Sequence, residues 1–225
     1  THGLHLRRYR MQSKVILSAT ALLITIPAFL FYLTDFADLP VGERALASLF
    51  QAVTPRTAGY NTVDLTKMSD TSQAVTILLM LTGGAPGSTA GGMKVTTLAV
   101  LIANAAAVFH RREDSRLFDR RLDYSAIRNA AAILLLYLSL TFVGAAVISE
   151  VEGLPLGACL YETASAAGTV GLTLGLTPQL GTLSQSILVL LMFFGRVGGL
   201  TLIYAAFSGH DLTYARYPKE MITVG

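Results

Sequence analysis

The chain alternates between long, uncharged apolar stretches and short segments that carry most of its charges. A hydrocarbon layer of about 30 Å is crossed by roughly 20 apolar helical residues. The apolar stretches therefore predict four membrane-spanning helices, at 15–34, 73–109, 129–149 and 184–208. The second stretch is longer than one straight crossing needs, so we expect it to be interrupted.

Charged residues flank these stretches unevenly. Arg and Lys gather at the start of the chain, in the segment 111–128 and in the tail 210–225, whereas Asp and Glu follow the first and third stretches. Cytoplasmic flanks of membrane helices are enriched in Lys and Arg. Both ends of the chain and the Arg-rich 111–128 linker are therefore expected in the cytoplasm, which requires an even number of crossings.

Two moderately apolar segments, 42–60 and 155–172, lie between consecutive spans and are too short to cross and return as helices. Each ends in a small, hydroxyl-rich stretch that contains glycine. This pattern predicts a short re-entrant helix followed by an extended return, which is tolerated at membrane depth where protein buries it or water lines it. The expected fold class is an all-α membrane protein with four transmembrane helices and two re-entrant pore helices.

The two halves of the chain resemble each other, which indicates an internal repeat. Residues 50–54 align with 161–165, and residues 57–61 align with 169–173, so that each copy is a span, a re-entrant segment and a span. The expected organisation is one repeat at 1–110, a linker at 111–128, a second repeat at 129–209 and a tail at 210–225.

Each re-entrant segment ends in a Thr-x-Gly motif like the start of the potassium-channel filter sequence T-V-G-Y-G. Glycine allows the unusual backbone angles that turn successive carbonyls the same way, and such carbonyls replace the hydration shell of a potassium ion. A glycine-containing turn is the alternative for one copy alone, and two copies at matched positions favour a filter. The candidate filter residues are Thr57, Ala58, Gly59, Tyr60, Thr169, Val170, Gly171 and Leu172.

The second apolar stretch is interrupted at 83–92, where five glycines and one proline forbid a continuous helix. A phosphate-binding loop is excluded because no Gly-Lys-Ser/Thr sequence is present. We expect a broken helix whose loop lies in or under the ion path and acts as a gate, with a passive kink as the alternative. The candidate gate residues are Gly83, Gly84, Gly87, Ser88, Thr89, Gly91 and Gly92.

Arg196 is the only charged residue between Glu162 and Asp211, and it lies within the fourth apolar stretch. A charge inside a membrane is energetically unfavourable and indicates a function. We expect Arg196 beside the ion path, with Glu162 on the second re-entrant helix as its partner. The alternative is a purely structural tie between Arg196 and Glu162 or a backbone carbonyl.

Composition narrows the classes of function. Of the 225 residues, 52% are hydrophobic and 14% are charged, whereas soluble domains carry about 25% charged residues. These values argue against a soluble enzyme and against a nucleic-acid-binding module. One cysteine, Cys159, leaves no intrachain disulfide. We expect neither enzyme activity nor a nucleic-acid partner.

Four motifs, in this order, resemble the Trk/Ktr/HKT superfamily of potassium transporters, with the membrane subunit of bacterial Ktr systems as the nearest likeness. The motifs are RTAGYNTVDL (56–65), GGAPGSTAGGMK (83–94), ASAAGTVGL (164–172) and FFGRVGGLTL (193–202). Members of that superfamily have four span–pore–span repeats around one pore. The two repeats here resemble the third and fourth, so the chain is expected to supply half of a pseudo-fourfold, potassium-channel-like pore and to be the C-terminal half of a longer subunit.

The resemblance implies potassium uptake across the cytoplasmic (inner) membrane by a multi-pass, pore-forming subunit. It places the filter glycines at Gly59 and Gly171, the intramembrane gate at 83–92 and the family's buried arginine at Arg196. Potassium is the implied cargo, and sodium is the candidate coupling or activating ion. The implied partners are membrane lipid, the N-terminal half of the same subunit, a second copy in a homodimer and a cytosolic nucleotide-binding regulatory ring.

Two other classes of function are alternatives. A secondary transporter with discontinuous helices and a midplane substrate site explains the interrupted stretch but not the paired Thr-x-Gly motifs. Its repeats are usually inverted, whereas the two repeats here run in the same orientation. A structural or receptor membrane protein explains neither feature.

Overall fold

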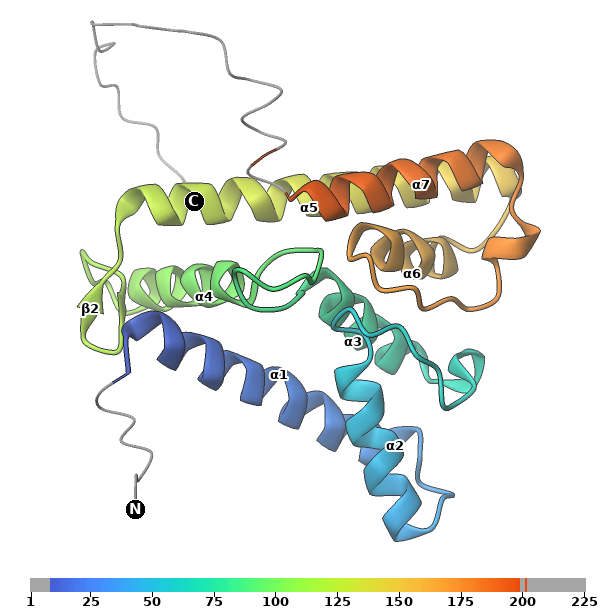
Figure 1. Ribbon diagram of the computed structural model, residues 1–225, viewed down its shortest axis with the longest axis horizontal. Coiled ribbons are helices and arrows are strands. Elements are labelled where there is room, and N and C mark those ends of the chain that lie inside the picture. The colour runs from blue at the N-terminus through green and yellow to red at the C-terminus, as the bar shows by residue number, and fades with distance from the viewer. Residues whose placement is uncertain (1–8, 199–200, 202–225) are drawn as a thin grey trace, which may run out of the picture.

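The computed structural model describes residues 9–198 and 201, and these residues form mainly helices (Figure 1). The order long helix, short helix, extended segment, 3₁₀ turn and helix occurs twice. In chain order the elements are α1 (Met11–Thr34), α2 (Val41–Val53), η2 (Leu65–Lys67), α3 (Asp70–Leu81), α4 (Val95–Phe109), β1 (Arg116–Leu117), β2 (Arg120–Arg121), α5 (Tyr124–Glu152), α6 (Leu156–Ala167), η3 (Thr177–Gln179) and α7 (Thr182–Val197).

Helices α1 and α5 are long and apolar enough to cross a membrane, and α3, α4 and α7 are shorter apolar helices. Large apolar side chains on α1 and α5, such as Ile26, Phe29 and Phe142, are more than half exposed, at 63%, 66% and 56%. Such faces are stable in contact with lipid, because burial in hydrocarbon replaces burial in a protein core.

The expected spans correspond to these helices as follows. The stretch 15–34 lies in α1, and 129–149 lies in α5. The stretch 73–109 is divided between α3 and α4. Helix α7 contains the first part of 184–208, and most of the remainder, like the tail 210–225, lies outside the described residues.

The two halves pack against each other through α6, α3, α4 and α5. Helices α5, α6 and α7 contact one another, α3 contacts α6, and α4 contacts α5, while α1 packs on α2, α3 and α4. Figure 1 shows α6 between α7 and the loop that leads from α6 to α7. A buried cluster that includes Phe31, Met80 and Tyr161 joins α1, α3 and α6.

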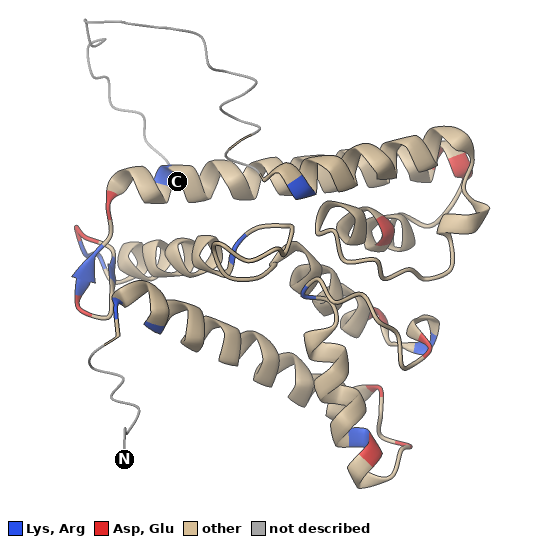
Figure 2. Cartoon of the chain, viewed as in Figure 1, with Lys and Arg blue, Asp and Glu red and all other residues tan. Residues whose placement is uncertain are grey.

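The basic 111–128 linker contains a small β-hairpin, which the hydropathy pattern does not predict and which departs from an all-α fold. Arg116 pairs with Arg121, and Leu117 pairs with Arg120. The two residues at the tip, Phe118 and Asp119, have positive φ values of 47° and 61°, as a tight turn between twisted strands requires. Figure 2 shows many of the Lys and Arg residues at this end of the molecule.

Carboxylates connect the helix ends in both halves. Asp35, directly after α1, accepts hydrogen bonds from the backbone N–H of Ser69 (2.6 Å) and from the hydroxyl of Ser72, at the start of α3. Glu152, at the end of α5, accepts one from the backbone N–H of Gly181 (2.9 Å), at the start of α7. Negative charge is favourable at a helix N-terminus. In each half a carboxylate at the end of the long helix therefore stabilises the start of the helix that follows the 3₁₀ turn.

These contacts lead to a prediction for Asp35. Burial acts to raise the pKa of Asp35, but hydrogen bonds from Ser72, Thr34 and Ser69 outweigh it and hold the pKa below its ordinary value of 3.8. A carboxyl whose pKa is lowered by folding stabilises the folded state above the ordinary pKa, and the contribution is lost as the pH falls through the lowered value. We expect Asp35→Asn to reduce the free energy of unfolding by about 1 kcal/mol at neutral pH, with an effect that shrinks as the pH falls below 3.8 and through the lowered pKa.

Thermal unfolding of the purified protein and of Asp35→Asn, over a series of pH values, measures this difference. An equal difference at neutral and at low pH would show that the ionised carboxylate does not stabilise the junction between α1 and α3.

Candidate functional site

Two short loops with the same unusual backbone follow the short helices α2 and α6. In the first loop (57–60), Thr57 and Gly59 have positive φ values of 72° and 73°. In the second loop (169–172), Thr169 and Gly171 have φ values of 53° and 93°. The residue between each pair has negative φ. Alternation of this kind turns successive peptide carbonyls toward the same side, whereas an extended strand alternates them.

The N–H groups of both loops point back toward the short helices. The N–H groups of Ala58 and Gly59 donate to the carbonyl of Thr54, at 3.1 Å each. The N–H of Val170 donates to the carbonyl of Ser165 (2.8 Å), and that of Gly171 donates to its hydroxyl (3.2 Å).

Most carbonyl groups of the two loops, unlike the N–H groups that point back toward the short helices, have no hydrogen-bond partner among the described residues. No described residue donates a hydrogen bond to the carbonyl oxygens of 57–59 or of 169–171. Both loops are largely open, since only Val170 of these six residues is buried, and their carbonyls are available to a ligand. Six unpaired carbonyls in two adjacent loops therefore form a surface suited to a cation.

The fourth residues of the two predicted sets differ from each other. The carbonyl of Tyr60 accepts a hydrogen bond from the hydroxyl of Thr54 (2.7 Å), and the Tyr60 side chain is 73% exposed. The side chain of Leu172 is buried, at 1% exposure. Of the predicted first-loop residues, Thr57, Ala58 and Gly59 keep free carbonyls and Tyr60 does not.

The two loops touch each other at Gly59. A Cβ atom added to Gly59 would lie 2.0 Å from the carbonyl oxygen of Val170. No side chain fits in this space, so glycine is needed here for room as well as for its positive φ.

The interrupted span forms a closed loop between α3 and α4. Its base is joined by hydrogen bonds from the N–H of Gly83 to the carbonyl of Met93 (2.7 Å) and from the N–H of Met93 to the carbonyl of Leu81 (2.9 Å). The predicted residues 83–92 therefore form a compact loop whose two ends lie side by side. We call residues 83–92 the broken-helix loop.

The broken-helix loop lies directly against the second loop. A Cβ atom added to Gly91 would lie 2.2 Å from the side-chain hydroxyl of Thr169. The Thr169 hydroxyl is itself buried without a hydrogen-bond partner among the described residues. Three segments far apart in the sequence, 57–60, 83–92 and 169–172, thus meet at one place.

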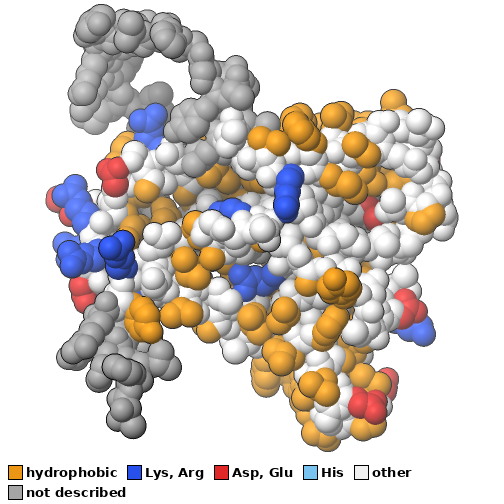
Figure 3. Space-filling model, in the orientation of Figure 1, with side chains coloured by type: hydrophobic (Ala, Val, Ile, Leu, Met, Phe, Trp, Pro, Cys, Tyr) orange, Lys and Arg blue, Asp and Glu red, His pale blue; other side chains and the backbone are white. Residues whose placement is uncertain are grey.

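Basic side chains hold the broken-helix loop through its carbonyl groups. The guanidinium of Arg196 donates to the carbonyl of Thr89, and the ammonium of Lys94 donates to that of Ala90. Arg56, directly before the first loop, donates to the carbonyl of Gly83 (3.2 Å). Figure 3 shows basic side chains in the middle of this face, apart from the charged end of the molecule.

None of these three cations has a carboxylate partner among the described residues, whose ion pairs are Lys67–Asp64 and Arg121–Asp114. Sequence reasoning missed Arg56 and Lys94 as loop contacts. The available signal was their position, since each charge directly adjoins a glycine motif inside an apolar region.

The hypothesis that Glu162 is the partner of Arg196 is wrong. The Glu162 carboxylate accepts hydrogen bonds from Thr173, Leu174 and Thr177, all in the segment after the second loop. Arg196 instead binds a backbone carbonyl, the alternative kind of tie. The sequence places both residues near the filter. It does not show that the segment 173–177 covers the side of α6 that carries Glu162, because that depends on the tertiary structure.

Comparison with known proteins assigns the family. Residues 10–211 match the family TrkH, described as cation transport protein. The chain belongs to the TrkH family. The resemblance to Trk/Ktr proteins is thereby confirmed.

Two relatives of the TrkH family are similar along nearly the whole chain. The Ktr system potassium uptake protein B of Bacillus subtilis is 33% identical over 97% of this chain and 50% of its own length. The potassium/sodium uptake protein NtpJ of Enterococcus hirae is 36% identical over 97% of this chain and 51% of its own. The chain thus spans about half the length of these relatives.

The fold is also similar to a solved member of the family. The crystal structure of the potassium transporter TrkH from Vibrio parahaemolyticus matches with a TM-score of 0.70 and 21% sequence identity, over 86% of this chain and 43% of that one. The relatives named here are transport proteins, which confirms the expectation that this TrkH-family chain is not an enzyme. Family membership and the two long apolar helices make it a membrane protein.

Proposed function

We propose that the chain forms two of the four quarters of a potassium pore in an uptake subunit of the Trk/Ktr type. The observation that carries this proposal is the set of six unpaired carbonyls in two touching loops with alternating φ. A dehydrated potassium ion needs such oxygens in place of its water shell. The two similar loops supply part of the cage, and the N-terminal half of the subunit supplies the rest.

In this proposal the broken-helix loop is a gate beneath the filter. Its support is the contact between Gly91 and Thr169 and the hydrogen bond from Arg196 to the carbonyl of Thr89. The loop carries no regular hydrogen bonds along its tip, apart from the turn from Ser88 to Ala85, so it can move without breaking a helix. Arg196 adds a positive charge beside the cation path and restrains the loop at the same time.

The location and partners follow from the same proposal. The subunit lies in the cytoplasmic (inner) membrane, with both ends of this segment and the 111–128 linker in the cytoplasm, as the basic residues of the linker favour. It forms a homodimer, is surrounded by membrane lipid and is regulated by a cytosolic nucleotide-binding ring. Potassium is the cargo, and sodium is a coupling or activating ion.

The test is potassium uptake by the full-length subunit in a bacterium that lacks its own potassium transport. We expect growth and uptake at low external potassium, with potassium preferred over sodium. Absence of potassium uptake in cells that contain the folded protein in their membrane would contradict the proposal.

A further inference from the structure

Glu162 lies in the middle of α6 and is almost fully buried, with 3% of its surface exposed. Its Oε1 atom accepts hydrogen bonds from the hydroxyl of Thr173 (2.7 Å) and the N–H of Leu174 (2.9 Å). Its Oε2 atom accepts one from the hydroxyl of Thr177 (2.6 Å). Hydrogen bonds to an ionised carboxylate are stronger than neutral ones. Glu162 therefore ties the segment after the second loop to the short helix that precedes it.

Among its described residues, the first half has no carboxylate tie of this kind, and its loop exit is held instead by a neutral hydrogen bond from the hydroxyl of Thr54 to the carbonyl of Tyr60 (2.7 Å). Residues 50–54 align with 161–165, so Gln51 on α2 is the counterpart of Glu162. Gln51 is as buried as Glu162, at 1% exposure, but its Nε2 atom has no hydrogen-bond partner among the described residues.

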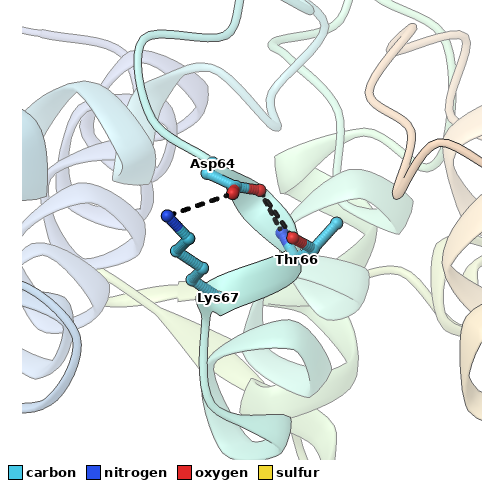
Figure 4. A network of polar contacts seen from close by, with 3 residues as sticks. All are labelled: Asp64, Thr66 and Lys67. Carbon is cyan, nitrogen blue, oxygen red and sulfur yellow. Dashed lines mark hydrogen bonds and ion pairs between the residues drawn. The ribbon is translucent and has the colours of Figure 1, made fainter.

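The first half has a carboxylate in the segment after its loop instead. Asp64 accepts hydrogen bonds from the N–H (3.1 Å) and the hydroxyl (2.6 Å) of Thr66, and it pairs with Lys67 at 3.6 Å (Figure 4). These contacts cap the 3₁₀ helix η2 from within its own segment. They do not connect the segment to α2.

The carboxylate occupies different positions in the two halves: Asp64 lies in the segment after the first loop, whereas Glu162 lies on the short helix before the second loop. Asp64 caps η2, whereas the residue that precedes η3 is Leu176, whose side chain has no hydrogen-bond acceptor. Glu162 on α6 does not cap η3, and it binds the segment around η3 through the hydroxyls of Thr173 and Thr177 and the N–H of Leu174. Within the described part of the chain, a carboxylate connects the segment after the loop to the short helix only in the second half.

We propose that Glu162 is a positioning residue for ion discrimination: its ties to Thr173, Leu174 and Thr177 hold the second loop at a fixed distance from α6. The second loop is then anchored on both sides, because Ser165 already binds the N–H groups of Val170 and Gly171. A sodium ion is smaller than a potassium ion, so carbonyls must close in around it. The exit of the second loop is held by three hydrogen bonds to a carboxylate, whereas the exit of the first is held by one neutral hydrogen bond, from Thr54 to Tyr60. The second loop therefore resists this movement more strongly and contributes more to potassium preference than the first. This inference rests on the proposed function.

The experiment compares Glu162→Gln with Asp64→Asn in the full-length subunit, which is the same carboxylate-to-amide change after the other loop. Potassium and sodium uptake and the thermal unfolding midpoint are measured for each. We expect Glu162→Gln to reduce the preference for potassium over sodium by about tenfold, the factor that corresponds to one charge-assisted hydrogen bond. Asp64→Asn leaves the preference unchanged, because asparagine caps a helix as well as aspartate does.

A second variant separates the effect of the hydrogen bonds to Glu162 from the effect of its negative charge. Thr173→Val combined with Thr177→Val keeps the Glu162 carboxylate but removes two of its three donors, and we expect the same loss of preference. The inference is overturned if Glu162→Gln lowers only the unfolding midpoint and leaves the preference unchanged. It is also overturned if Glu162→Gln loses the preference while the double variant keeps it, since charge alone would then be responsible. Failure of the unmodified subunit to take up potassium would contradict the proposed function instead.

Discussion

Gly59→Ser is expected to abolish the potassium preference of the full-length subunit, whereas Gly171→Ser should weaken it by about tenfold. Both glycines have positive φ, 73° and 93°, where a side chain introduces strain. Only at Gly59 is there also no space, because an added Cβ atom would lie 2.0 Å from the carbonyl oxygen of Val170. The serine at Gly59 must push that carbonyl away, so it disturbs both loops at once. At Gly171 no atom lies within 4 Å of the added Cβ.

The measurement is the dependence of uptake on potassium and sodium concentration for each variant. Gly42→Ser in α2 and Gly157→Ser in α6 are matched controls, since both glycines have open space around them and neither has positive φ. Unchanged apparent affinities for both ions in the Gly59 and Gly171 variants would remove these residues from the filter.

Arg196→Gln is expected to raise the maximal rate of potassium uptake several-fold without loss of the fold. A fixed positive charge about 8 Å from a passing cation, at an effective dielectric of ~20, repels it by roughly 2 kcal/mol. The substitution removes this charge and weakens the hold on the carbonyl of Thr89, so both effects favour an open path. Because Glu162 is satisfied by other partners, the variant leaves no buried carboxylate unpaired and its stability should change little.

Flux through the full-length protein in liposomes, together with the thermal unfolding midpoint, measures this effect. Arg120→Gln, at an exposed arginine of the hairpin, is the control for loss of one positive charge elsewhere. A fall in both flux and stability would make Arg196 a structural support, and unchanged flux would exclude it from the ion path.

Several features of the fold are local properties of the sequence. Apolar length alone predicts α1 and α5, because about 20 consecutive apolar residues are stable in a bilayer whatever their neighbours are. The five glycines of 83–92 predict the break between α3 and α4 for an equally local reason, since glycine weakens any helix. The hairpin at 116–121 was not predicted, because two-residue strands with charged side chains leave no hydropathy signal.

The site was predicted only in part. The paired Thr-x-Gly motifs identify both loops through their glycines, which adopt positive φ readily. The positive φ of Thr57 and Thr169 was not predictable, because β-branched residues rarely adopt it. The contact of Gly59 with Val170 and that of Gly91 with Thr169 were not predictable, since each joins segments separated by many residues. The same holds for the hydrogen bond from Arg56 to Gly83.

Glu162 and Arg196 illustrate the division most clearly. The sequence by itself determined that two charges lie in apolar surroundings and that each needs a polar partner, because an unpaired charge in a low-dielectric environment is highly unfavourable. Only the tertiary structure decided which partners they have. The return segment 173–177 reaches Glu162 and the broken-helix loop reaches Arg196. Hydropathy and backbone freedom are properties of neighbouring residues, whereas a hydrogen bond between distant segments depends on how the whole chain packs.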